Sequence, residues 1–290
     1  MELTMFRLSL VKSMVKSLPF HVRFQSHHFG PFMPISQPNR ISISSTKLLL
    51  KVKQHSSNRQ KTNKLAMEFE INRKPRILCL HGFRTSGSIL QKLIGRWPQT
   101  VLEKLDLHFL DGLFPARGKS DVEGFFDPPY FEWYQSSQDF KEYRNFEECV
   151  AYIEDYMINH GPFDGLLGFS QGAMLSAAVP GMQLQGMAFT RVPKIKFLII
   201  ISGAKFLGYK FGQPKLAANA FSSPVECPSL HIIGEMDFLK PGGIDLLESF
   251  VDPVVIHHPK GHIIPRLDDN NIKIMLSFIE KIQKMPSDEQ

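Results

Sequence analysis

A serine between two glycines, in Gly168-Phe169-Ser170-Gln171-Gly172, has the spacing of a nucleophile elbow. Residues 163–167 before this motif are typical of a buried strand, and residues 173–178 after it favour a helix. A sharp turn from strand to helix lifts a serine hydroxyl clear of its own backbone, and glycines let the two elements approach closely. The alternative is a glycine-rich turn that holds a serine by chance, so partners elsewhere in the chain must decide.

An acid and a base follow the serine in the chain. Asp237 comes just after a predicted strand at 228–233, and His262 comes in a tight loop after a predicted strand at 254–257. The order serine, aspartate, histidine, each at the carboxyl end of a strand, is the order of α/β-hydrolases. We therefore predict Ser170 as the nucleophile, His262 as the general base and Asp237 as the acid that orients the base.

The other candidate acids and bases receive structural interpretations. Asp245 is the rival acid, but it is predicted early in a helix, where acidic side chains interact favourably with the helix dipole. His81, His257 and His258 lie at or near predicted strand ends, and we expect them to be structural histidines.

The loop after the first predicted strand, 76–80, has the composition of an oxyanion loop. It begins His81-Gly82-Phe83, at the place where α/β-hydrolases position an oxyanion donor. We assign one donor to the backbone N–H of Phe83 and the other to the backbone N–H of Gln171. An ordinary loop in which Ser86 caps the following helix is the structural alternative, and both interpretations hold together.

The remaining segments alternate between apolar runs and amphipathic stretches, which indicates strands and helices in turn. This alternation predicts an α/β fold of the α/β-hydrolase type, a doubly wound, mostly parallel sheet with helices on both faces. Helices are predicted at 89–105, bent or split at Pro98, at 145–159, capped by Asn145, and at 271–284; further strands are predicted at 107–110 and 196–201.

Residues 111–144 form the least regular segment and are rich in aromatic side chains. A long loop in a compact domain is usually functional or disordered, and this many aromatics argues against disorder. We interpret the segment as a cap over the active site, with Phe114, Phe131 and Trp133 binding the substrate. The alternative is a packed surface excursion with a small core of its own.

Composition bounds the class of protein. The chain has 290 residues, of which 43% are hydrophobic and 21% charged, as in globular proteins. It has no apolar window long enough to span a membrane. Residues 67–290 hold 23 basic and 27 acidic side chains and show no basic patch, so no nucleic acid partner is expected. The three cysteines cannot pair off completely and show no CxxC spacing, so we expect a reducing compartment. Acyl transfer by a serine, a histidine and an aspartate needs neither a metal nor an organic cofactor.

The first 66 residues differ from the rest of the chain, with eleven Lys or Arg and a single acid, Glu2. This basic, serine-rich composition is typical of a transit peptide. A basic amphipathic stretch at 5–16 favours the mitochondrion, whereas the serine content favours the chloroplast. The competing interpretation is an extension that is seldom translated, upstream of a compact domain that begins at Met67. In both cases we expect 1–66 to be disordered and 67–290 to form the hydrolase domain.

Residues 75–283 resemble the FSH family of serine hydrolases, which includes the ovarian-cancer-associated gene 2 esterase and plant members. The resemblance implies a small α/β-hydrolase with carboxylesterase activity, cytosolic or nuclear in several members. It is carried by four stretches: Leu80-His81-Gly82-Phe83-Arg84-Thr85-Ser86-Gly87, Phe163 to Ala173, Gly234 to Asp237 and Gly261-His262-Ile263-Ile264-Pro265; Tyr130-Phe131-Glu132-Trp133-Tyr134 resembles plant members.

We expect a serine hydrolase that cleaves small-molecule carboxylic esters through an acyl-enzyme, with a preference for medium or long acyl chains. Two alternatives share these residues: a ligand receptor with little turnover on a retained hydrolase fold, and a thioesterase or peptidase. The sequence predicts no oligomeric state.

Overall fold

A computed structural model describes residues 73–208 and 211–285. The predicted amino-terminal extension, 1–66, and the predicted domain boundary after it lie outside the described residues. In the described ranges, no helix is both long and apolar enough to cross a membrane.

The domain is built on one six-stranded sheet in which every neighbouring pair of strands is parallel. The strand order is β10-β9-β8-β7-β1-β2. The strands are β1 (Arg76–Leu80), β2 (Asp106–Leu110), β7 (Gly165–Phe169), β8 (Phe197–Ile201), β9 (Ser229–Gly234) and β10 (Val254–His258). The parallel, doubly wound sheet predicted from the sequence is confirmed.

The central strands are apolar throughout because both of their faces are covered. All five residues of β8, Phe197–Ile201, are buried, and so are all six of β9. Side chains from opposite faces of the sheet belong to two separate hydrophobic cores: Leu198 and Ile200 pack in one, and Ile199 and Ile201 in the other. The sheet is therefore the middle layer of three.

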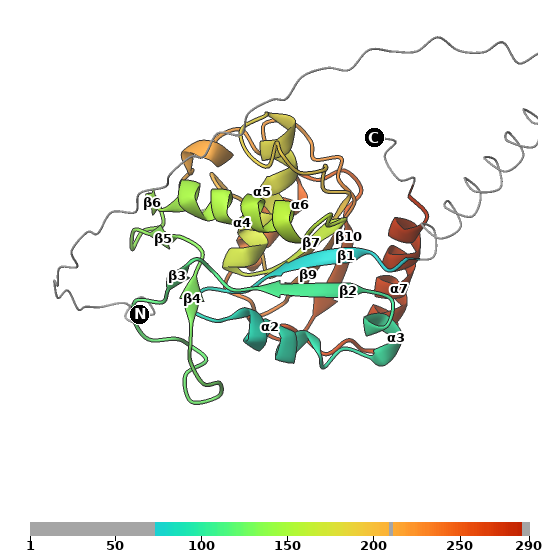
Figure 1. Cartoon of the computed structure of the whole chain (residues 1–290). Coiled ribbons are helices and arrows are strands. Elements are labelled where there is room, and N and C mark those ends of the chain that lie inside the picture. The colour runs from blue at the N-terminus through green and yellow to red at the C-terminus, as the bar shows by residue number, and fades with distance from the viewer. Residues whose placement is uncertain (1–72, 209–210, 286–290) are drawn as a thin grey trace, which may run out of the picture. The chain divides into compact units, whose positions relative to one another are not determined.

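Helices cover both faces of this sheet (Figure 1). One core contains residues of α4, α5 and α6, and the other contains residues of α2, α3 and α7. The bounds are α2 (Gly87–Ile94), α3 (Gln99–Leu102), α4 (Phe146–His160), α5 (Gln171–Leu184), α6 (Lys240–Leu247) and α7 (Asp269–Gln283), with a 3-10 turn, η1, at Lys215–Ala217.

The structure tests the predicted helix ends at Pro98 and at Asn145. The predicted helix 89–105 is split, as expected, into α2 and α3 with Pro98 between them, and Ser86 caps α2 by accepting from the Ile89 N–H at 3.3 Å. The predicted cap by Asn145 is wrong. Asn145 occupies the N-cap position of α4, but it adopts a left-handed conformation with φ of 60° and its side chain makes no cap hydrogen bond; the side-chain amide instead donates to Gln135 at 2.7 Å.

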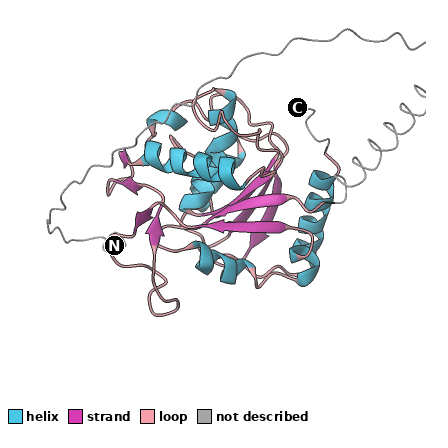
Figure 2. Cartoon of the chain, viewed as in Figure 1, coloured by secondary structure: helices cyan, strands magenta, loops and turns pink. Residues whose placement is uncertain are grey.

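The aromatic-rich segment 111–144 is folded into two small hairpins beside the main sheet (Figure 2). β3 (Phe114–Pro115) pairs with β4 (Phe131–Glu132), and β5 (Gln135–Ser136) pairs with β6 (Tyr143–Arg144), each antiparallel. Trp133 and Tyr134, between the hairpins, are fully or almost fully buried in the core that contains α4 and α5. The part of the segment between its two hairpins therefore packs into the core of the domain.

The strand order reverses between β1 and β7. From β1 the chain moves outward to β2, and it then returns to the other side of β1 to form β7. In open parallel sheets, ligands bind at the carboxyl ends of the strands on either side of such a reversal. The loops that follow β1 and β7 are those that carry Phe83 and Ser170.

Candidate active site

Ser170 occupies a strained turn between β7 and α5. Its φ of 54° and ψ of −115° are unusual for a residue other than glycine. A Cβ at Gly168 would lie 2.3 Å from the Gly172 carbonyl oxygen, and a Cβ at Gly172 would lie 2.2 Å from the Leu80 carbonyl oxygen. The turn is therefore tight enough to require glycine at both positions, which is the geometry of a nucleophile elbow.

The three residues predicted as nucleophile, base and acid lie together, with His262 within hydrogen-bonding distance of both Ser170 and Asp237. The Nε2 atom of His262 is 2.9 Å from the Ser170 hydroxyl oxygen. The Nδ1 atom of His262 is 3.0 Å and 3.1 Å from the two carboxylate oxygens of Asp237. This pattern favours the tautomer in which Nδ1–H donates to the carboxylate and Nε2 accepts a hydrogen bond from the serine hydroxyl.

Asp237 is held as a buried acceptor. Its side chain is only 2% exposed, and one of its oxygens also accepts from the Leu239 N–H at 2.8 Å. Burial raises the pKa of Asp237, but the hydrogen bond and charge of His262, with the Leu239 N–H, outweigh burial and lower the pKa below its ordinary value. The carboxylate is therefore ionised at neutral pH and can accept a hydrogen bond from His262. The rival acid, Asp245, pairs instead with Lys205 at 2.9 Å.

The predicted oxyanion donors lie in the loops after the two central strands. Within the described residues, neither the Phe83 N–H nor the Gln171 N–H has a hydrogen-bond partner. The two loops are joined directly, because the Gly172 N–H donates to the His81 carbonyl at 3.1 Å. Gln171 is also the first residue of α5, where the helix dipole favours negative charge.

His81 is a structural histidine, as predicted. Its side chain is fully buried; Nδ1–H donates to the Gly82 carbonyl at 2.7 Å, and Nε2 accepts from the Gly112 N–H at 2.8 Å. Burial lowers the pKa of His81 to about 4, despite the opposing effects of the Gly82 carbonyl and Asp111. The neutral ring thus braces the loop that carries Phe83 against the loop after β2.

Trp133 lies elsewhere than predicted. Its side chain is 0% exposed, its indole N–H donates to the His81 carbonyl at 2.8 Å, and its ring packs on the His81 ring with centroids 4.8 Å apart. The Gln171 side chain completes this support by accepting from the Trp133 N–H and donating to the Tyr134 carbonyl. Because its ring is enclosed by the loops it supports, Trp133 has no surface for a substrate, and this part of the predicted aromatic wall is wrong.

The other two predicted substrate contacts keep partial exposure. Phe131 lies directly beside the oxyanion loop, since its N–H donates to the Thr85 carbonyl at 2.7 Å. Phe114 is on the partner strand β3 and packs partly against the core. Phe131 is therefore tied by its backbone to the loop that carries Phe83.

The cation beside the oxyanion loop is already paired. The Arg84 guanidinium lies 2.7 Å from the Glu132 carboxylate, which is almost completely buried, and it also packs over the Phe83 ring at 4.6 Å. A guanidinium engaged in this way contributes to the structure of the loop. It offers little free charge to an anionic substrate.

The sequence did not indicate that Phe238 lies against His262. The Phe238 ring packs against the imidazole with centroids 4.5 Å apart, although 71% of the residue is exposed. Met236, on the other side of Asp237, is 74% exposed. The available signal was the apolar character of both neighbours of the predicted acid.

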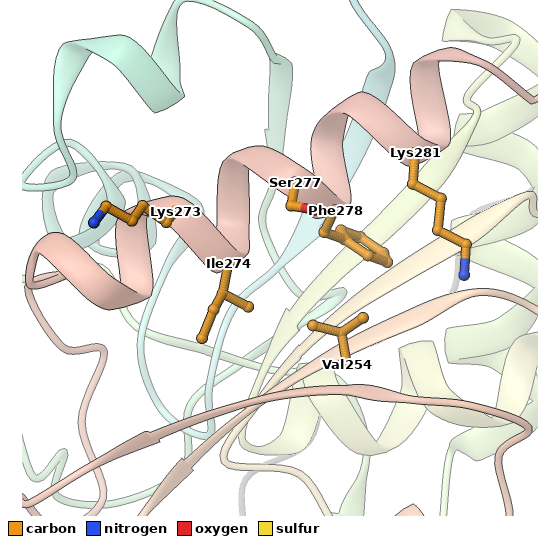
Figure 3. A pocket seen from close by; sticks show the side chains of 6 residues that line it. All are labelled: Val254, Lys273, Ile274, Ser277, Phe278 and Lys281. Carbon is orange, nitrogen blue, oxygen red and sulfur yellow. The ribbon is translucent and has the colours of Figure 1, made fainter.

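The cavity shown in Figure 3 has a volume of about 340 Å³ and lies away from this cluster. Val254, in its lining, begins β10, whereas the active-site loops follow the carboxyl ends of the strands. The cavity therefore contributes nothing to the candidate site. Its lining comprises Val254, Lys273, Ile274, Ser277, Phe278 and Lys281.

A parallel α/β sheet with a serine in a strained elbow at the topological reversal defines a class, the serine hydrolases. Sequence comparison agrees: a family model described as serine hydrolase (FSH1) matches residues 67–274. The chain therefore belongs to the serine hydrolase (FSH1) family, and the resemblance found in the sequence is confirmed.

Several curated proteins and one solved structure are similar to this chain. The chain is 30% identical to Esterase C25G4.2 of Caenorhabditis elegans, over 73% of this chain and 96% of that protein. It is 30% identical to Esterase OVCA2 of Homo sapiens, over 66% and 89%. A protein named dihydrofolate reductase, from Schizosaccharomyces pombe, is 31% identical over 66% of this chain, but the match spans only 44% of that longer protein. The crystal structure of Arabidopsis thaliana SOBER1 is 17% identical, covers 73% of this chain and 100% of its own, and has a TM-score of 0.44.

Proposed function

We propose that this serine hydrolase cleaves carboxylic esters through a covalent acyl-enzyme on Ser170. The observation that carries the proposal is the 2.9 Å contact between His262 Nε2 and the Ser170 hydroxyl, with Asp237 on the other ring nitrogen. A serine hydroxyl is a weak nucleophile until an adjacent base removes its proton. The esterase names of the relatives from Caenorhabditis elegans and Homo sapiens agree with this activity.

In the first half of the proposed reaction, His262 Nε2 takes the Ser170 proton as the hydroxyl oxygen attacks the ester carbonyl carbon. The carbonyl oxygen becomes an oxyanion, and the imidazolium forms beside ionised Asp237. When the tetrahedral intermediate collapses, the bond to the alcohol oxygen breaks and His262 gives its proton to that oxygen. The acyl group remains on Ser170.

In the second half, water replaces the alcohol. His262 removes one water proton as the water oxygen attacks the acyl carbon, and it then returns that proton to the Ser170 oxygen as the acid leaves. The oxyanion of both intermediates is placed against the Phe83 and Gln171 backbone amides. Each such donor typically contributes about 3 to 4 kcal/mol to transition-state stabilisation.

The substrate is proposed to be an uncharged ester with a medium or long acyl chain. Phe131, partly exposed beside the oxyanion loop, supplies an apolar surface on the oxyanion side of the serine. Arg84 is engaged by Glu132 and leaves little charge for an anionic acyl group. Burying a methylene contributes about 0.8 kcal/mol, so each methylene added to the acyl chain is expected to raise kcat/KM as long as it contacts this apolar surface.

The nucleophile is tested by Ser170→Ala, with Ser277→Ala on α7 as the matched control. We expect Ser170→Ala to lower kcat/KM for p-nitrophenyl esters by at least roughly a thousandfold and to abolish labelling by a fluorophosphonate probe. Ser277→Ala is expected to behave as wild type, because Ser277 lines the cavity at the other end of the strands. Labelling and turnover by the Ser170→Ala variant would contradict the proposal.

Parallel assays separate the alternative functions. Faster cleavage of thioesters than of matched oxygen esters would favour a thioesterase. Single-turnover behaviour with strong stabilisation by a ligand would favour a receptor.

The acyl preference is tested with p-nitrophenyl esters from C2 to C16. We expect kcat/KM to rise by up to about fourfold per methylene until the apolar surface ends, and Phe131→Ala to flatten that rise. Phe114→Ala is the comparison on the paired strand and is expected to have a smaller effect, because Phe114 packs partly into the core. A series in which acetate and butyrate are best, unchanged by Phe131→Ala, would place the acyl chain elsewhere.

A further inference from the structure

Three exposed apolar side chains lie on the two loops that carry Asp237 and His262, and one of them, Phe238, packs against the His262 ring. Phe238 is 71% exposed, Met236 is 74% exposed and Ile263 is 38% exposed. They come from the loops after β9 and β10, on either side of Asp237 and next to His262 in the chain. Exposed apolar side chains gathered at one place commonly mark a surface that binds an apolar partner. We call these three residues the base-side patch.

The backbone of the base-side patch is held in place by the same groups that build the site. The Met236 N–H donates to the Lys260 carbonyl at 3.2 Å. The Leu239 N–H donates to the Asp237 carboxylate at 2.8 Å, and the Lys240 N–H donates to the Asp237 carbonyl at 3.0 Å. Phe238 therefore sits in a turn whose backbone is held on both sides, and its ring rests against the His262 imidazole.

Three charged or titratable side chains near the base-side patch, Glu235, Lys240 and His257, interact with one another. Glu235, next to Met236, accepts from both Lys240 and His257. Because these three groups interact among themselves, they add little net charge beside the three exposed apolar side chains. An uncharged, apolar group is the chemistry that fits the base-side patch.

The position of Phe238 relative to His262 indicates which end of an ester it meets. During acyl transfer, His262 Nε2 must reach the leaving alcohol oxygen at hydrogen-bond distance, about 2.6 to 3.2 Å. The first carbons of the alcohol consequently lie beside the imidazole. A ring whose centroid is 4.5 Å from the imidazole centroid lies within contact range of those carbons.

The second phenyl ring at the imidazole belongs to the other side of the site. Phe169 packs on His262 with centroids 5.1 Å apart, and a Cβ at Gly82 would lie 2.9 Å from the Phe169 ring. Phe169 thus lies toward the oxyanion loop and is only partly exposed. The acyl and alcohol sides of the site are therefore lined by different elements.

We propose that the base-side patch, led by Phe238, binds the alcohol part of the ester and gives the enzyme a preference for apolar alcohols. This inference rests on the proposed ester hydrolysis by Ser170. It assigns Phe238 a role in leaving-group specificity, independent of the acyl preference attributed to Phe131.

The test varies the alcohol while the acid is constant. Alkyl acetates from methyl to octyl are hydrolysed by wild type, Phe238→Ala and Phe238→Leu, and the released acid is titrated. For wild type we expect kcat/KM to rise by up to about fourfold per methylene over the first carbons. Phe238→Ala should lower the octyl-to-methyl ratio by roughly tenfold or more, and Phe238→Leu should restore part of it, since a leucine keeps apolar surface.

Two controls separate specificity from damage to the site. Leu184→Ala removes another exposed apolar side chain, 67% exposed, at the far end of α5, and should leave the alcohol series as in wild type. A series of methyl esters with lengthening acyl chains is measured on Phe238→Ala and should keep its wild-type slope. Thermal melting and fluorophosphonate labelling report whether each variant is folded with a reactive serine.

Several outcomes would overturn the inference. Equal losses for all acetates in Phe238→Ala would make Phe238 a positioning residue for His262, and a changed acyl slope would place it on the acyl side. An unchanged alcohol series would remove any role in specificity. If wild type hydrolyses no ester at all, the proposed function fails instead, which distinguishes the two failures.

Discussion

At the scale of single residues, the site depends on a histidine whose two nitrogens have different partners. Asp237 holds Nδ1 at 3.0 Å, so that Nε2 faces Ser170 at 2.9 Å. An amide in place of this carboxylate would offer an N–H or an uncharged oxygen to Nδ1. In the proposed mechanism, either change removes the charge that stabilises the imidazolium.

We predict that Asp237→Asn lowers kcat by about a thousandfold to ten-thousandfold while the protein remains folded. Asp245→Asn is the matched control, since Asp245 was the rival acid and pairs with Lys205. Steady-state kinetics on one p-nitrophenyl ester measure both variants. A small effect of Asp237→Asn combined with a large effect of Asp245→Asn would reverse the assignment of the acid.

At the scale of elements, the elbow joins β7 and α5 to the loop after β1. Gly172 is the contact point: its N–H donates to the His81 carbonyl at 3.1 Å, and a Cβ there would lie 2.6 Å from the same oxygen. Backbone atoms on both sides leave little freedom to relax. A side chain at 172 must therefore push the oxyanion loop away from the serine.

We predict that Gly172→Ala slows fluorophosphonate labelling at least tenfold and lowers stability by about 1 to 3 kcal/mol or more. Gly186→Ala is the control, because Gly186 has a φ of +64° but no atom within 4 Å of its Cβ position. That variant is expected to lose about 1 to 2 kcal/mol of stability from the strained backbone and to label normally. Normal labelling of Gly172→Ala would show that the elbow tolerates a wider separation between residue 172 and the loop after β1.

At the scale of the whole molecule, buried neutral histidines link folding to pH. Burial lowers the pKa of His231 to about 3, and the pKa of His81 to about 4. An unfolded histidine has a pKa of about 6.5, so between that pH and the folded pKa the unfolded chain binds more protons. Stability is therefore fully present above about pH 6.5 and is lost as the pH falls.

We predict that the free energy of unfolding drops between pH 6.5 and 4.5 with a slope of up to about 1.4 kcal/mol per pH unit for each such histidine. His231→Gln should make the slope shallower by about one histidine's contribution. It should also lower stability at pH 7, because the His231 ring packs on Phe250 with centroids 4.9 Å apart. Urea unfolding at several pH values provides the slopes, and identical slopes for wild type and His231→Gln would contradict the prediction.

The sequence by itself determined the class of fold and the positions from which the chemistry is proposed. Ser170, Asp237 and His262 each follow an apolar run, and parallel strands bring the residues after their carboxyl ends to one edge of a sheet. Local pattern together with one topological rule was sufficient. The glycines of the elbow and the cap at Ser86 were predictable for the same reason, since each is a requirement of the local backbone.

Only the tertiary structure decided which aromatic side chains meet the site. Trp133 and Phe238 both lie close to predicted active-site loops, yet one is fully buried and the other is 71% exposed. Burial depends on which distant segments pack over a side chain: Trp133 is enclosed by the loops that carry His81 and Gln171, which are far from it in the chain. Sequence patterns report periodicity within one element, whereas the packing between elements that buried Trp133 and left Phe238 against His262 arises only when the whole domain folds.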